Sequence, residues 1–182
     1  IAETFCSFLQ PLFDEAEKNL REALDFMLQV QDLKSAGMCW RYLGQIELHN
    51  QDWPKAQNSF IKALGYHQKA EHRPAFEATT LFLGLAYYYD QQYDNAEKFI
   101  SKAIQITSRR THVSFYGKTA KAVDIMLKSK MNNCDEKDIE FLIKEIESDL
   151  KGHEQAWVSR EYWYISQSYD NLGLEKKAKF YL

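Results

Sequence analysis

The chain has 182 residues, of which 45% are hydrophobic and 27% charged, and its net charge is −3 at pH 7. This nearly balanced charge disfavours direct nucleic-acid binding, because surfaces that bind nucleic acid usually carry a basic stripe. No stretch reaches the roughly 18 consecutive apolar residues of a membrane-spanning helix, so we expect no membrane partner. With only seven glycines and three prolines, continuous helix is feasible almost everywhere.

Three segments of the chain align without gaps. They begin at Phe13, Trp53 and Tyr93, which are 40 positions apart. In each, an aromatic residue is followed by an alanine three positions later, a large apolar residue four positions after that, and a second alanine three further on. These positions share one face of a helix, where the alanines let a neighbouring helix approach and the large residue fills the groove between helices. The apolar positions are Ala16, Leu20 and Ala23, then Ala56, Phe60 and Ala63, then Ala96, Ile100 and Ala103.

A partner helix precedes the second and third segments. Gly44 and Gly84 lie at its centre, again 40 positions apart. A glycine inside a helix costs roughly 1 kcal/mol relative to alanine, so we interpret both as points where another backbone comes close. Asp52 is a predicted N-cap, and Pro74 suits the opening turn of a helix. The partner helix of the first segment is predicted to be cut short, ending near Leu12.

The C-terminal part of the chain follows the repeat less closely. Residues 116–127 and 139–150 predict two helices joined by a turn at 131–134, with Asp135 near the start of the second. A final pair is predicted around residues 162–169 and 178–182. We expect residues 1–182 to form one repeat domain. Both ends fall inside a repeat, which predicts a fragment of a longer array or of a multidomain protein.

At these positions the chain resembles the tetratricopeptide repeat (TPR) family. The family pattern is Trp-x-x-Leu-Gly-x-x-Tyr in the first helix and Ala-x-x-x-Phe in the second. The matching residues are Trp40, Leu43, Gly44, Ala56 and Phe60 in one repeat, and Leu83, Gly84, Tyr87 and Ala96 in the next. The departures are Glu47, Thr80 and Ile100. The resemblance implies an all-α, right-handed superhelical solenoid of antiparallel helix pairs, and the 40-residue period predicts helices longer than those of the usual 34-residue repeat.

Sequence patterns of catalysis and metal binding are weak. Gly117-Lys118-Thr119 is similar to the end of a phosphate-binding loop, but His112 stands where that loop needs glycine. His153 begins a zinc-protease-like pattern, but Trp157 replaces the second histidine. We therefore expect no enzyme activity, no cofactor and no metal.

Three widely spaced cysteines, Cys6, Cys39 and Cys134, do not form a disulfide framework. Free thiols are typical of a reducing compartment, so we predict a cytoplasmic protein.

The TPR resemblance implies a concave groove lined by the first helix of each pair, which would bind a protein or a short peptide. We expect the lining residues on the side of each helix that faces away from its own packing partner. They are Arg41, Tyr42, Gln45, Leu48 and His49, then Leu81, Phe82, Leu85, Tyr88 and Tyr89, then Trp163, Tyr164 and Gln167. Aromatic and arginine side chains of this kind often form binding hot spots. Their largely apolar character favours an amphipathic or extended apolar segment.

A further resemblance, to the bacterial Rap-type peptide-pheromone receptors, rests on the repeat length, on the helix start at Phe115-Tyr116 and on the terminal Lys177–Tyr181 segment. The function predicted from these patterns is a protein- or peptide-binding scaffold of a cytoplasmic signalling or regulatory protein. The alternative is a helical accessory or oligomerisation domain of a larger enzyme or transcription regulator, associating through its end repeats.

Overall fold

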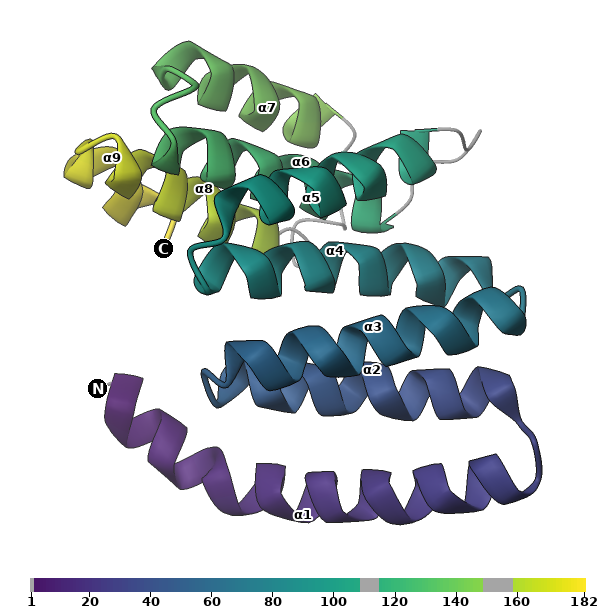
Figure 1. Cartoon of the computed structure of the whole chain (residues 1–182). Helices are drawn as coiled ribbons and strands as arrows, with labels where there is room; N and C mark the ends of the chain where they lie inside the picture. Colours follow the sequence, from purple (N-terminus) through teal and green to yellow (C-terminus); the bar gives the residue numbers. More distant parts are fainter. Residues whose placement is uncertain (1, 109–114, 149–158) are drawn as a thin grey trace. The chain divides into compact units, whose positions relative to one another are not determined.

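The structure, a computed structural model, describes residues 2–108, 115–148 and 159–182, and within these ranges it contains helices and no strand (Figure 1). The chain divides into two compact units, residues 1–90 and residues 91–182. The first contains α1 (Ala2–Gln29), α2 (Leu33–His49), α3 (Trp53–Lys69) and α4 (Arg73–Tyr89), and the second contains α5 (Tyr93–Ser108), α6 (Phe115–Lys130), α7 (Glu136–Ser148), α8 (Ser159–Asn171) and α9 (Glu175–Phe180). The predicted all-α array of paired helices is confirmed. The prediction of one single domain stays a prediction.

The first three turns of the N-terminal unit share one conformation. Gln31, Gln51 and Glu71 have φ angles of 57°, 60° and 50°, so a left-handed residue occurs every 20 positions. After each of them the next backbone N–H donates to a carbonyl five residues earlier, as in Asp52 to Glu47 at 2.9 Å. This is the Schellman ending of a helix. These turns produce the 40-residue period, one helix pair for every two turns.

Close packing joins α2 to α3. Phe60 is fully buried, and a Cβ atom added to Gly44 would lie 2.7 Å from the Phe60 ring. The glycine is therefore required by an aromatic ring rather than by a second backbone, which corrects the interpretation drawn from the sequence. Asp52 caps α3, as predicted, because its carboxylate accepts a hydrogen bond from the Lys55 N–H at 3.3 Å. Pro74 lies in the opening turn of α4, also as predicted.

The predicted end of a short helix near Leu12 is wrong. Helix α1 runs without a break from Ala2 to Gln29 and contains Pro11 in its interior. Proline removes one helical hydrogen bond but does not by itself create a turn, and residues 1–14 contain no glycine or asparagine to form one. The helix bends instead in its N-terminal third (Figure 1), as expected near an internal proline. Within the described residues, the first repeat segment is therefore continuous with the helix that leads into it and is not preceded by a turn.

The C-terminal unit has helices at the four predicted places, with bounds that differ by one to three residues, and residues 149–150 of the predicted second helix lie outside the described residues. The turn at 131–134 separates α6 from α7, and Asp135 caps α7 by accepting hydrogen bonds from the backbone N–H groups of Lys137 and Asp138 at 2.9 and 3.2 Å. Gly173, with φ of 73°, ends the α8 segment before α9. The Gly117-Lys118-Thr119 sequence lies inside α6, while His112, His153 and Trp157 lie outside the described residues. None of the described helices is both long and apolar enough to cross a membrane.

Candidate functional site: an uncovered groove between α1 and α2

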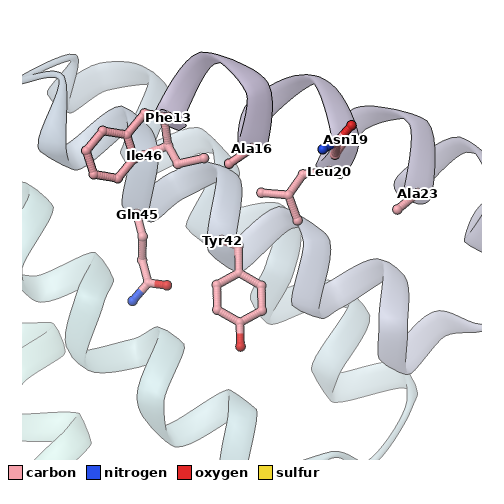
Figure 2. A pocket seen from close by; sticks show the side chains of 8 residues that line it. All are labelled: Phe13, Ala16, Asn19, Leu20, Ala23, Tyr42, Gln45 and Ile46. Carbon is pink, nitrogen blue, oxygen red and sulfur yellow. The ribbon is translucent and has the colours of Figure 1, made fainter. Parts of the chain in front are cut away.

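An open groove of about 620 Å³ lies between α1 and α2. Figure 2 shows side chains of both helices lining it, with Tyr42 and Gln45 projecting from α2. The lining residues are Phe13, Ala16, Asn19, Leu20 and Ala23 from α1, and Tyr42, Gln45 and Ile46 from α2. Most of this surface is apolar, and its polar groups are the amides of Asn19 and Gln45 and the hydroxyl of Tyr42. It can bind an apolar segment and offers two amide side chains for hydrogen bonds.

The groove continues as an exposed apolar stripe along α1. Leu12, Phe26 and Val30 are 59%, 57% and 54% exposed. Helical spacing places Leu12 and Phe26 on the same side of α1 as Ala16 and Ala23, and Val30 follows directly after the last residue of the helix. Among the described helices, α1 packs against α2 alone. A monomer rarely leaves such a stripe uncovered without a function for it.

The repeat explains why this surface is open. Each groove residue has a counterpart 40 positions later in the same unit, and most of these counterparts are buried. Ala56, Phe60, Ala63 and Ala86 are fully buried, and Ser59 and Leu85 are nearly so. There, α2 lies against both α3 and α4. At the groove between α1 and α2 the corresponding helix is absent from the described residues.

The structure brings together two of the residues predicted on α2, Tyr42 and Gln45, in the groove. His49 lies beside them at the surface and packs on Phe13 of α1, with ring centroids 4.2 Å apart. Leu48 is half-buried. Arg41 differs from the expectation, because it is 7% exposed and lies 4.3 Å from the centroid of the Tyr42 ring.

The predicted groove residues on α4 pack inside the protein or against neighbouring aromatic rings. Leu81 and Leu85 are 1% and 2% exposed, so the expectation that they line an open surface is wrong. Phe82 stacks on Phe60 with centroids 5.9 Å apart. Tyr89 stacks on Trp53 at 5.3 Å and meets Tyr88 edge to face.

The physical reason for this difference is the position of the preceding pair. In a repeat array the predicted face of each first helix also faces the pair before it, and α3 covers that face of α4. The sequence reasoning identified the face and overlooked this neighbour.

In the C-terminal unit, Trp163 is 38% exposed, Gln167 is half-buried and Tyr164 is 7% exposed. Burial raises the pKa of the Tyr164 hydroxyl to about 12, so Tyr164 belongs to the core rather than to a surface. None of the three lines the cavity of about 630 Å³ in that unit. That cavity is bounded by charged residues of α7 and α9 together with Tyr169 and Tyr181, and Lys177 bridges Glu136 and Glu140 across it.

Two buried ionisable groups lie in the interior of the first unit. His67 is fully buried, neither ring nitrogen has a hydrogen-bond partner among the described residues, and burial, with His72 and Arg41 nearby, lowers the pKa of the imidazole to about 4. Burial raises the pKa of Glu47, although the Ser59 hydroxyl bonded to the carboxylate opposes the shift. Over the described residues, no cluster of histidine, cysteine and acidic side chains is suited to hold a metal.

Sequence reasoning missed the α1 wall of the groove. Ala16, Leu20 and Ala23 were identified as packing residues, and each is only partly buried here. The available signal was that residues 1–12 contain no glycine or asparagine at which a turn between two antiparallel helices could form.

Comparison with solved structures identifies the class of fold. The chain is similar to two crystal structures of a candidate kinesin light chain from Podosopora anserina with nearly identical TPR-like repeats, one of them a single-residue variant. The TM-scores are 0.59 for the variant and 0.56 for the other, each at 15% identity, and each match covers 97% of this chain and 92% of that chain. No family model matches the sequence, and no curated protein matches it.

The chain is therefore a TPR-like array of helical repeats. Stacked repeats of this kind form extended concave surfaces. The similarity supports the fold, and the Rap-type resemblance stays a prediction.

Proposed function

We propose that this chain is a protein- or peptide-binding scaffold of a cytoplasmic signalling or regulatory protein, and that the partner binds in the groove between α1 and α2. The observation that carries the proposal is the exposed apolar surface formed by this groove and the α1 stripe. At the equivalent positions 40 residues later, the same kind of apolar surface is buried, and α2 lies against both α3 and α4 there. A second protein segment is the natural ligand for an apolar surface of this shape.

The cysteine chemistry of the chain supports the proposed compartment. Cys39 and Cys134 are free thiols, which fits a reducing environment. Burial raises the pKa of both thiols, so neither is activated as a nucleophile at neutral pH. The groove itself contains no titratable acid–base pair, and its polar groups are amides and one phenol.

Site-specific photo-crosslinking tests the proposal. A benzophenone amino acid replaces Tyr42 in the groove, or, as a matched control, exposed Asn58 on α3. After irradiation in a lysate of the source organism, we expect the residue 42 probe to yield discrete protein adducts that excess unlabelled chain displaces, and the residue 58 probe to yield none of them. Identical adducts at both positions, or none at residue 42, would contradict a binding role for this groove.

A further inference from the structure

We infer that the occupant of the groove is an amphipathic helix of a partner protein, one that carries a small residue at its centre and a basic residue on its flank, and that this helix completes the first repeat. The inference rests on the proposed function and specifies the partner. Its template is the pairing of α2 with α3, which the same sequence pattern produces 40 positions later.

The shape of the groove selects a helix. In the template, α2 reaches α3 closely because Gly37 and Gly44 face His67 and Phe60, where an added Cβ would come within 2.6 and 2.7 Å of the rings. In α1, Ala16 and Ala23 flank Leu20 as Ala56 and Ala63 flank Phe60. This alternation of small and large residues fits the ridge of an approaching helix, and a small residue at the centre of that helix permits the close approach.

The walls of the groove and the length of the exposed stripe also fit a helix. α2 lies against both α3 and α4 in the template, and the groove is likewise bounded by α1 on one side and α2 on the other. The exposed stripe runs from Leu12 along α1 to Val30 directly after the helix, and its helical part, Leu12–Gln29, is 18 residues or about 27 Å long. A docked helix of similar length would cover Leu12, Phe26 and Val30 together.

Acidic residues on α1 determine which charge the flank of the docked helix should carry. The rim of α1 beside the stripe carries Glu15 and Glu22, both exposed and neither ion-paired within the part of the chain that the structure describes. Their counterparts on α3 are Lys55 and Lys62, and the Lys62 ammonium lies 4.1 Å from the centroid of the Trp40 ring on the covering helix. The position equivalent to Trp40 on the docked helix therefore meets Glu22, which favours a basic residue there.

The same charges disfavour a second copy of this chain as the occupant. If two α1 helices paired through this face, the acidic rims of both copies would lie along one interface. Like charges brought together at an interface oppose association. A partner with a basic flank has no such penalty.

Synthetic peptides test the inference directly. One has the sequence of residues 33–49, the covering helix of the template, and the other is its Trp40→Arg variant; both carry a fluorophore for anisotropy titration in reducing buffer. We expect both to bind the intact chain saturably, with the Trp40→Arg peptide about two- to fivefold tighter. Glu22→Lys in the chain should reverse that preference. The inference would be overturned if neither peptide bound saturably. It would also be overturned if Glu22→Lys left the preference for the Trp40→Arg peptide unchanged.

A second variant distinguishes a closely packed helix from any apolar ligand. Ala16→Leu with Ala23→Leu adds apolar area but fills the space that a helix needs, so peptide affinity should fall at least about tenfold. An extended apolar segment would gain affinity from the same change, which would contradict the helix. Lys18→Leu, on the opposite side of α1, adds a similar apolar group and should leave binding unchanged. Circular dichroism must show the same helicity for all variants, and the exposed Glu22→Lys variant keeps the test decisive if the double variant unfolds.

The outcome separates this inference from the proposed function. If the residue 42 probe captures a partner that the Trp40→Arg peptide does not displace, the groove binds protein but the occupant is not this helix. If sedimentation shows a dimer that Ala16→Leu with Ala23→Leu dissociates, the occupant is a second copy and the inference is wrong. Displacement of the captured partner by the peptide, with a monomeric chain, is the result that we expect.

Discussion

At the residue scale, the contact between Gly44 and Phe60 determines how closely α2 and α3 pack. Gly44→Ala places a methyl group 2.7 Å from the ring, so we expect it to destabilise the fold by about 1–3 kcal/mol. Phe60→Ala should cost about 3–5 kcal/mol because the ring is fully buried. In urea denaturation, the double variant should cost less than the sum of the two, because removing the ring removes the clash. Simple additivity would show that the two residues are not in contact.

His67 predicts a pH dependence of stability. Its pKa is about 4 in the folded chain and about 6.5 when unfolded, so between these values the unfolded state binds more protons. The free energy of unfolding should therefore be highest above pH 6.5 and should decline by about 3 kcal/mol as the pH falls to 4. His67→Leu should remove most of this decline. Equal pH profiles for the two proteins would contradict the burial of a neutral imidazole.

At the element scale, the recurring turns contain strain that the sequence does not relieve. Gln51 holds a φ of 60°, a conformation that costs a non-glycine residue about 1–2 kcal/mol. Gln51→Gly should therefore raise the free energy of unfolding by about 1 kcal/mol and the melting temperature by a few degrees. Asn58→Gly, in the exposed interior of α3, should lower stability by a similar amount. Destabilisation by both substitutions would argue against the left-handed turn.

Helix positions and their packing faces were predictable because they repeat every 40 residues. Ala56, Phe60 and Ala63 were assigned to one buried face, and all three are fully buried. The turns were harder to predict, because Gln31, Gln51 and Glu71 adopt a left-handed conformation that residue type alone does not indicate. The continuity of α1 through Pro11 was missed, because the sequence reasoning ended the first helix near Leu12.

The candidate site was predicted only in part, and the reason is the environment of each repeat. Tyr42 and Phe82 occupy equivalent positions, yet Tyr42 lines an open groove while Phe82 stacks on Phe60. Periodicity makes such positions look alike, whereas exposure depends on whether a further helix covers them. For Tyr42 and Gln45, no described helix does so.

At the scale of the whole molecule, the structure places an apolar, uncovered groove between α1 and α2 of the N-terminal unit of a helical repeat array. A scaffold of this kind recognises its partner by supplying a face that a second chain covers. Binding should therefore be weakened by Tyr42→Ala in the groove and unaffected by Ile61→Ala, which is exposed on α3 and is not part of the groove lining. Truncation of a residue that anchors the partner in the groove is expected to cost about 2 kcal/mol or more of binding free energy, or roughly thirtyfold in affinity. Calorimetric titration measures this change.

Hydrogen–deuterium exchange of the intact chain, with and without the partner captured at residue 42, tests the central claim most directly. The account predicts slower exchange on binding in residues 13–23 of α1 and 42–46 of α2, the segments that line the groove. It predicts no change in α7 and α9, which line the separate cavity of the second unit. Protection confined to α7 and α9, or absent from α1, would contradict the assignment of the binding surface.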